Sequence, residues 1–584
     1  MSKLALKLVK ECYETKNPYL DLGYCRLSDQ DFIVDGPLDE ALRKCVHLES
    51  LVLSNEWVDF RTEDFAVSQN GAQGKGKNKF TAIPAAVTAL VNLTTLIIAG
   101  DGESGLRIDH IPLLPLPKLR ALNLNGNNIS TINGLRELCA LEILYLAGNK
   151  IAEISGLEAL INLKELSLGY NQLTEIKGLE LLTGLQSLDL GVNQLTEIKG
   201  LATLTSLQKL YLGRNQLTEI KGLTTLTSLQ ILDLSSNPLT EIKGLEFLTG
   251  LQTLALIGNQ LTEIKGLEFL TGLQTLALNG NELTEIKGLA TLTGLQSLEL
   301  NGNQLTEIKE LRLLTGLQTL TLNGNELTEI KGLATLTGLQ ILDLGGNHLT
   351  EIKGLEFLTS LRYLDLGSNQ LTEIKGLESL TGLQELNILN NQLTEIKGLA
   401  TLTGLHSLGL SGNQLTEIKG LDHLVNLNVL SLTRNEIQDI KPLLQLLCRE
   451  QLPLKIVAKE DDLKYEGRIN VAGNPLIAPP IEIVRQGNEA VISYFADLEK
   501  QGADYLYEAK LLIVGQPRAG KTSLRIKLFD SLAALPEEDK TTRGIDIQRL
   551  EFDIRDVEGN PRKFYYNIWD FGGQQIYQTT HQFF

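Results

Sequence analysis

The residues best suited to chemistry lie in one short run near the end of the chain. Residues 515–522 read GQPRAGKT, which matches the phosphate-loop pattern G-x-x-x-x-G-K-[ST] without a mismatch. Two glycines let the backbone bend around a phosphate, and the N–H groups at the start of a following helix add positive potential. Lys521 would reach the β- and γ-phosphates of a nucleotide, and the hydroxyl of Thr522 would bind Mg²⁺. A glycine turn with a coincidental lysine is the alternative, but a strand pattern at 509–515 and a helix pattern at 522–532 frame the loop.

Two further stretches carry residues that fit the same chemistry. FYYNIWDFGGQQ reads as a strand that ends in Asp570, which would hold Mg²⁺ through water. The N–H of Gly573, just after it, would donate to a γ-phosphate. Earlier, KTTRGIDI offers Thr541 and Thr542, one of which would bind Mg²⁺ when a γ-phosphate is present. In this order and spacing the three stretches predict one nucleotide site.

Most of the chain before these stretches is a repeat. Asparagine recurs every 22 residues from Asn127 to Asn435, which makes 15 units in register. Each unit follows L-x-x-L-x-L-x-x-N-x-L, the leucine-rich-repeat pattern. In a short strand Leu298 and Leu300 would point inward, while Asn303 would hydrogen-bond backbone groups buried by the following turn.

The repeat determines the expected fold, because one unit cannot bury its leucines alone and stacked neighbours must supply the core. The sequence predicts an α/β chain: a curved solenoid with a parallel sheet on its concave face, followed by the first half of a P-loop doubly wound domain. The TEIKGL segments predict tight turns or 3₁₀ helix on the outer side. The expected divisions are degenerate N-terminal repeats and a cap at 1–115, the solenoid at 116–476, an amphipathic connector helix at 477–508 and an incomplete nucleotide domain at 509–584.

Both ends of the repeat array depart from the pattern. Cys25 takes the asparagine position of a first degenerate unit, and the units at 48–57 and 93–102 keep their leucines but lose the asparagine. Between those two units, the polar, glycine-rich residues 68–80 predict a mobile loop. After Asn435 the register breaks, and a long irregular unit that includes INVAGNPL is expected to close the array.

Composition limits the possible partners and the compartment. The 584 residues carry a formal net charge of −18, which argues against nucleic-acid binding. The five cysteines are scattered and show no C-x-x-C spacing, so reduced thiols in a cytoplasmic protein are expected. No apolar run is long enough for a membrane span.

The concave face of the expected solenoid is the predicted site for a protein partner. Asp343 and Asp365 share one column in adjacent repeats and would form an acidic ridge that could meet a basic partner. The alternative is that these side chains are merely solvated. The outward strand positions also include Asp189, Tyr211, Asp233, Glu299, Tyr363 and Glu385.

The last part of the chain resembles the Roc GTPase domain of the Roco family, in which leucine-rich repeats precede a Ras-like G domain. The motifs that carry the resemblance are GQPRAGKTS for the phosphate loop, TRGIDI for the first switch and WDFGGQQ for the second. The resemblance implies GTP or GDP with Mg²⁺ as ligands, with Thr542 favoured over Thr541 as the switch threonine and Gln574, beside Gln575, orienting the attacking water. The implied nucleotide-binding residues are Gly515, Arg518, Ala519, Gly520, Lys521, Thr522, Ser523 and Gly573; the implied metal ligands are Thr522, Thr542 and Asp570; and the implied catalytic residues are Lys521 and Gln574.

The resemblance implies a GTP-binding and GTP-hydrolysing switch whose repeats sense or recruit a partner. A Ras-like domain needs roughly 160 residues, whereas about 75 follow from Lys510, so the chain is expected to be the front part of a longer protein. The segments that read the guanine base, and the COR domain through which the family dimerises, would lie beyond Phe584. Two alternatives stay open: an interaction scaffold without a working nucleotide site, and a P-loop ATPase sensor, although such sensors usually carry the nucleotide domain before the repeats.

Overall fold

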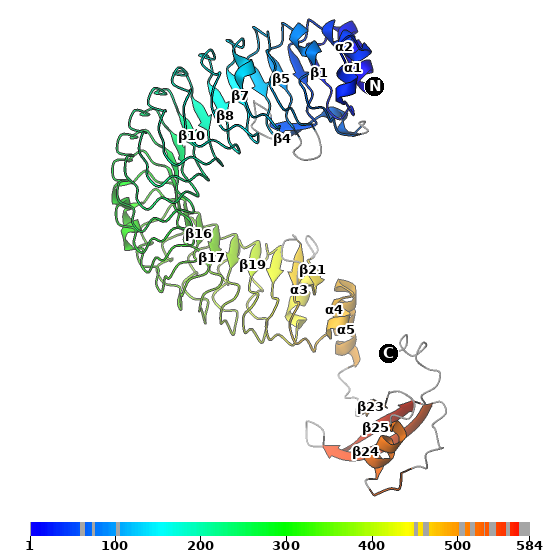
Figure 1. Ribbon diagram of the computed structural model, residues 1–584. Helices are drawn as coiled ribbons and strands as arrows, with labels where there is room; N and C mark the ends of the chain where they lie inside the picture. Colours follow the sequence, from blue (N-terminus) through cyan, green and yellow to red (C-terminus); the bar gives the residue numbers. More distant parts are fainter. Residues whose placement is uncertain are drawn as a thin grey trace. The chain divides into compact units, whose positions relative to one another are not determined.

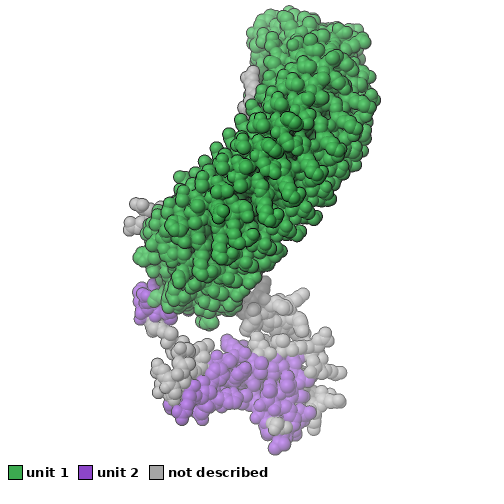
Figure 2. Space-filling view, turned by 90° about the vertical axis from the view of Figure 1, so that its left-hand side faces the viewer, with its two compact units in different colours: residues 1–492 green, residues 493–584 purple. Residues whose placement is uncertain are grey.

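The computed structural model divides into two compact units, residues 1–492 and 493–584 (Figure 2). The first unit is a solenoid, and the second contains a small mixed sheet. No helix within the described residues is long and apolar enough to cross a bilayer. The structure describes residues 2–58, 65–72, 76–100, 106–448, 454–459, 467–501, 508–513, 520–530, 532–535, 545–555 and 561–571.

The solenoid is built on one 20-stranded sheet whose strands all pair in parallel and line the concave side (Figure 1). Its strands are β1 (Tyr19–Asp21), β2 (Ser50–Val52), β5 (Thr95–Ile97), β6 (Ala121–Asn123), β7 (Ile143–Tyr145), β8 (Glu165–Ser167), β9 (Ser187–Asp189), β10 (Lys209–Tyr211), β11 (Ile231–Asp233), β12 (Thr253–Ala255), β13 (Thr275–Ala277), β14 (Ser297–Glu299), β15 (Thr319–Thr321), β16 (Ile341–Asp343), β17 (Tyr363–Asp365), β18 (Glu385–Asn387), β19 (Ser407–Gly409), β20 (Val429–Ser431), β21 (Lys455–Val457) and β22 (Arg468–Asn470).

Each three-residue strand contributes one central leucine to a continuous apolar column. Leu298 of β14 lies opposite Leu320 of β15, and the same register continues along the sheet. Leu298, Leu300 and Leu305 are fully buried, as are their counterparts in neighbouring repeats. The predicted solenoid with a parallel sheet on its concave face is therefore confirmed.

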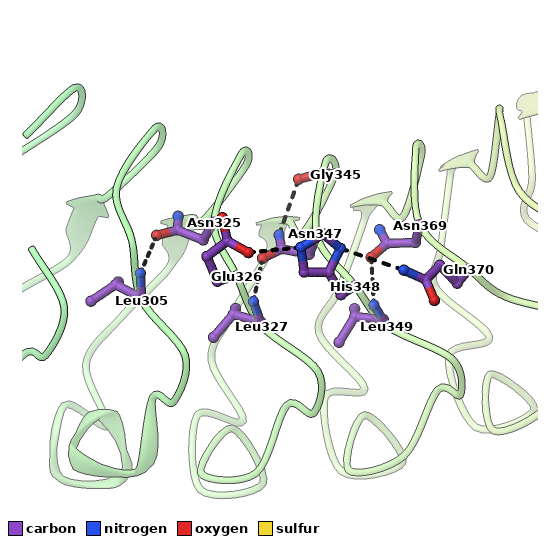
Figure 3. A network of polar contacts seen from close by, with 10 residues as sticks. All are labelled: Leu305, Asn325, Glu326, Leu327, Gly345, Asn347, His348, Leu349, Asn369 and Gln370. Carbon is purple, nitrogen blue, oxygen red and sulfur yellow. Dashed lines mark hydrogen bonds and ion pairs between the residues drawn. The ribbon is translucent and has the colours of Figure 1, made fainter. Parts of the chain in front are cut away.

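The repeated asparagine closes each turn of the solenoid, as Figure 3 shows for three successive units. The Nδ2 group of Asn347 donates to the carbonyls of Leu322 and Leu344, both at 3.0 Å. Its Oδ1 accepts the backbone N–H of Leu327 at 3.0 Å. Because Asn347 is buried, these bonds satisfy backbone groups that would otherwise be buried without a hydrogen-bond partner. The expected role of the asparagine is confirmed.

The outer side of the solenoid consists of turns and short 3₁₀ helices, as predicted. Glycine is required there at Gly200, which has a φ of 90°, and a Cβ would lie 2.1 Å from the carbonyl oxygen of Ile176. The 3₁₀ helices of the repeats and their ends are η3 (Ala85–Ala89), η5 (Asn133–Leu135), η6 (Leu289–Thr291), η7 (Lys309–Leu313) and η8 (Lys441–Leu443).

Two helices cover the N-terminal end of the apolar column. Helix α1 (Lys3–Thr15) begins at Ser2, whose hydroxyl accepts the N–H of Ala5. Helix α2 (Pro37–Arg43) follows the 3₁₀ helix η1 (Asp29–Phe32). Their buried side chains, Val9 of α1 and Leu38 and Leu42 of α2 among them, shield the first repeat from water.

The second repeat contains an insertion that the sequence did not reveal. Strand β3 (Glu56–Val58) and strand β4 (Phe65–Val67) form an antiparallel hairpin, drawn on the concave side in Figure 1. Trp57 and Ala66 pack against Val52 and Ile97 of the concave sheet.

The asparagine of this repeat is displaced rather than lost. Asn78, beyond the hairpin, donates to the carbonyls of Leu22 and Leu53 at 2.8 Å. Its Oδ1 accepts the N–H of Leu27 at 2.9 Å, and Asn78 is fully buried. The expectation that this unit lacks its asparagine, and that residues 68–80 are simply a mobile loop, is wrong at Asn78. Within the same stretch, η2 (Gln69–Ala72) forms a further 3₁₀ turn.

At the C-terminal end of the solenoid, a longer unit is also closed by a side-chain amide. Helix α3 (Leu444–Leu447) follows η8, and Asn474 donates to the carbonyls of Leu432 and Val471. The expected irregular closing unit is therefore present. Two helices follow instead of the single connector helix expected: α4 (Ile481–Val484) and α5 (Asn488–Gln501). They are separated at Gly487, which adopts a φ of 95° that other residues rarely take.

The second unit contains three strands and one described helix besides most of α5. Strands β23 (Glu508–Ile513) and β25 (Pro561–Phe571) pair in parallel, and β24 (Ile545–Arg555) pairs with β25 in the antiparallel direction. The strand order is therefore β23, β25, β24. Helix α6 (Lys521–Phe529) packs against β25, where Ile568 is buried. This is the small sheet expected at the start of a P-loop domain.

Candidate nucleotide-binding site

The register of the small sheet brings three chain segments to one edge. Ile513, the last residue of β23, lies opposite Asp570 near the end of β25. Ile545, the first residue of β24, lies opposite Phe571. The chain therefore leaves β23 and β25, and enters β24, at the same edge. In open α/β sheets, ligands bind outside the carboxyl ends of the parallel strands.

Helix α6 begins where the phosphate-loop motif ends. Gly520 precedes it with a φ of 77°, in the left-handed region, and its carbonyl accepts the N–H of Leu524 at 2.8 Å. A Cβ at Gly520 would meet nothing within 4 Å, so glycine is favoured here by backbone conformation and not by lack of space. Lys521, Thr522 and Ser523 form the first turn and are half-buried. Backbone N–H groups of a first turn point beyond the helix end, which favours an anion there.

Charged and aromatic side chains tie the three strands together. The side chains of Asn567 on β25 and Glu508 on β23 are hydrogen-bonded. The guanidinium of Arg549 on β24 lies 3.7 Å from the ring centre of Tyr565 and 3.9 Å from the carboxylate of Glu508. The ammonium of Lys510 lies 5.4 Å from the ring centre of Trp569. These contacts link side chains of all three strands of the small sheet.

The structure describes some of the predicted site residues and not others. Gly520, Lys521, Thr522 and Ser523 lie together at the start of α6, and the backbone of Asp570 lies on the neighbouring strand near the edge. The remaining predicted residues lie outside the described residues: Gly515, Arg518, Ala519, Thr541, Thr542, Gly573, Gln574 and Gln575.

Two family models match the chain, one over the solenoid and one over the small sheet that follows it. The model described as "Leucine Rich repeats (2 copies)" matches ten stretches between residues 117 and 445, which together cover more than half of the chain. The model described as "Ras of Complex, Roc, domain of DAPkinase" matches residues 510–584. The chain belongs to the leucine-rich-repeat family and carries a Roc region after its repeats. Its leucine-rich repeats precede the matched Roc region, in which β23, α6, β24 and β25 lie.

Curated relatives match the chain over a limited stretch. A Roc-COR-CHAT protease from an unknown prokaryotic organism is 37% identical over 123 residues, which are 19% of this chain and 12% of that protein. The probable serine/threonine-protein kinase pats1 from Dictyostelium discoideum is 36% identical over 129 residues, or 20% of this chain and 4% of the kinase. The chain thus spans a small part of the curated relatives it matches.

The solenoid is similar to solved leucine-rich-repeat structures. A leucine-rich-repeat protein from Leptospira interrogans matches with a TM-score of 0.56 and 31% identity, over 60% of this chain and 92% of that structure. This similarity agrees with the parallel sheet and the stacked apolar column described above.

Sequence reasoning missed the residues that bind the small sheet together and the displaced Asn78. The first gave no signal along the sequence, because Tyr565 and Trp569 meet Arg549 and Lys510 only once the strands are paired. Asn78 gave no signal by spacing, since the inserted hairpin moves it out of the 22-residue register.

Proposed function

We propose that the chain belongs to a GTP-binding and GTP-hydrolysing switch, with the solenoid as the module that senses or recruits a protein partner. The observation that carries this proposal is the sheet register that joins Ile513 to Asp570 and Ile545 to Phe571. That register brings the motif-bearing ends of three strands to one edge, beside the first turn of α6. The match of the Roc model to residues 510–584 supports guanine nucleotide as the ligand.

Residues of this edge have separate roles in the proposal. The backbone of the loop with Gly515, Arg518, Ala519 and Gly520, and the first turn with Lys521, would hold the phosphates. The ammonium of Lys521 would meet the β- and γ-phosphate oxygens, and the N–H of Gly573 would donate to the γ-phosphate. Gln574 would orient a water molecule for in-line attack on the γ-phosphorus.

The donor set also fits a hydrated Mg²⁺ ion. Thr522 presents a hydroxyl from the first turn of α6, and Asp570 is the aspartate near the end of β25. These two residues, with Thr542 from the segment that enters β24, would hold the ion. A bound Mg²⁺ would supply positive charge to the phosphate oxygens as the γ-phosphoryl group leaves. Thr541 is the alternative to Thr542.

The test uses the full-length protein and a fluorescent GTP analogue. Unlabelled GTP should displace the analogue and ATP should not, while Gln574→Leu should keep the binding and slow hydrolysis by at least about tenfold. Equal displacement by ATP would favour an ATPase sensor. Absence of binding in a folded protein would favour a scaffold without a working nucleotide site.

The proposed partner surface is the concave face, and dimerisation is expected only through a COR domain. Localisation in the cytoplasm is part of the same proposal, because guanine nucleotides are the intended ligands. Fractionation of cells that express a tagged protein would test this point: recovery in a secreted fraction would contradict it.

A further inference from the structure

The twelve repeats that share the TEIK segment differ mainly on one surface. From residue 174 to residue 419 the outer segment T-E-I-K recurs twelve times without change. The strands of the same repeats, β8 to β19, carry ten different pairs of outward residues in twelve strands. The scaffold is thus held constant while the concave surface varies, as expected where that surface has a specific task.

Within this variable surface, strands β14 to β18 carry a charge of one sign. Their outward side chains include four carboxylates and one tyrosine, and their fifteen residues include no Lys, Arg or His. We call this set the acidic ridge; it comprises Glu299, Asp343, Tyr363, Asp365 and Glu385. Lys209 on β10 is the only cation in β8 to β13.

The two aspartates of the acidic ridge are neighbours held in place by neutral donors. Asp343 and Asp365 lie opposite each other in the register of β16 and β17. The Oδ1 of Asp343 accepts the N–H of Gly345 at 2.9 Å. Asp365 accepts the N–H of Gly367 at 2.7 Å and the amide of Asn387 at 2.8 Å. Within the part of the chain that the structure describes, neither carboxylate forms an ion pair.

The resulting field acts on groups inside the ridge. Partial burial, and then the charge of Asp365, raise the pKa of Asp343. Burial and the carboxylates of Asp365, Asp343 and Glu385 raise the pKa of Tyr363 to about 12. Neighbouring negative charge therefore acts on both groups in the same direction as burial.

On the outer surface of the same repeats, negative charges are mostly paired with positive ones. There, in eleven of the twelve T-E-I-K segments, the glutamate forms an ion pair with the lysine two residues later, as in the pairs Glu329–Lys331 and Glu351–Lys353, both at 2.6 Å. The partners are more than two-fifths exposed, so such pairs add little to stability and leave little net charge.

We propose that the acidic ridge docks a protein segment rich in Arg and Lys. A guanidinium or ammonium would form charge-assisted hydrogen bonds with the preoriented carboxylates of Asp343 and Asp365 and lie beside the ring of Tyr363. Charge complementarity of this kind steers association and selects among partners. The inference rests on the proposed function only in taking the solenoid as the interaction module.

The test measures binding of fluorescein-labelled peptides to the whole protein by anisotropy. The probes are a hexamer of Arg-Ser dipeptides and a hexamer of Glu-Ser dipeptides. The site variant is Asp343→Asn with Asp365→Asn, which removes two charges but keeps the size and one acceptor oxygen at each position for the N–H of Gly345 or Gly367. The matched control is Glu329→Gln with Glu351→Gln, which removes the same charge from the outer surface.

The site variant should weaken binding of the arginine peptide by about tenfold or more at about 150 mM salt, and the control by less than about twofold. The glutamate peptide should not bind. Equal losses in both variants, or no binding to the native protein, would overturn the proposal and leave a merely solvated surface. Circular dichroism verifies the fold, and GTP binding measured on the same samples separates this outcome from failure of the nucleotide site.

Discussion

Ile513 and Asp570 lie opposite each other on neighbouring parallel strands. Strand β23 ends at Ile513, and helix α6 begins eight residues later, at Lys521. Two segments separated by 57 residues thus share one edge, and the start of β24 joins them there. This convergence is the physical basis of the phosphate site proposed for the second unit.

Replacement of one ladder asparagine should destabilise the solenoid. Asn303→Ala removes a side chain that donates to the carbonyls of Leu278 and Leu300 and accepts the N–H of Leu283. Because these backbone groups stay buried, the free energy of unfolding should fall by about 3 kcal/mol. Urea unfolding followed by circular dichroism measures the change. The exposed neighbour is the control: Gln304→Ala should change it by less than about 0.5 kcal/mol, and an equal effect of both would refute this role.

Alanine should destabilise the solenoid at a glycine with a positive φ and be tolerated at a glycine without one. Gly200→Ala places a Cβ against the carbonyl oxygen of Ile176 and forces alanine to a φ of 90°. We expect a loss of about 2 kcal/mol or more in unfolding free energy. At Gly184 a Cβ would have 3.8 Å of clearance, so Gly184→Ala should be tolerated. A similar urea midpoint for the two variants would contradict the argument.

The displaced asparagine should protect the first two repeats. Asn78→Ala leaves the buried carbonyls of Leu22 and Leu53 without their donor. Backbone amides of β1 and β2 should then exchange with deuterium at least about tenfold faster, because local opening becomes cheaper by about 1.4 kcal/mol or more. Gln69→Ala, at an exposed residue of the same insertion, is the control. Unchanged protection in the Asn78 variant would show that the hairpin alone closes the turn.

The fold of the solenoid was predictable because its physics is periodic. The leucines and the asparagine recur every 22 residues, and each letter has one role in burial or hydrogen bonding. The insertion in the second repeat was not predictable, since Asn78 meets Leu53 only after a hairpin that no local pattern announces. The apolar spacing of the connector predicts one helix because it runs past Gly487, where the structure has a break between α4 and α5.

The motifs of the candidate site could be predicted from the sequence, but the side-chain contacts between the strands that carry them could not. The residues at the start of α6 and the aspartate near the end of β25 follow from spacing alone. The contacts of Arg549 with Tyr565 and Glu508 join residues of three different strands. Such contacts depend on strand order, which a short stretch of sequence does not specify.

The acidic ridge should lower stability at neutral pH. Because the folded protein raises the pKa of Asp343, folding costs more free energy when this carboxyl is ionised. Asp343→Asn removes that cost and keeps an acceptor for the N–H of Gly345. Its urea midpoint should exceed that of the native protein at about pH 7.5, and the gain should shrink as the pH falls toward about 4. If the urea midpoint of Asp343→Asn exceeded that of the native protein by the same amount in acid, an electrostatic origin of the stabilisation would be refuted.

The measurement that tests the central claim most directly is a titration of the full-length protein with a fluorescent GTP analogue and Mg²⁺. Two variants of α6 are compared: Lys521→Ala in the first turn, and Lys527→Ala in the last turn, where the ammonium donates to the carbonyl of Ala533. A phosphate site at the start of α6 predicts that the first variant loses about a hundredfold in affinity and the second less than about threefold. Equal affinities in the two variants, with both folded, would contradict a phosphate site at this edge of the sheet.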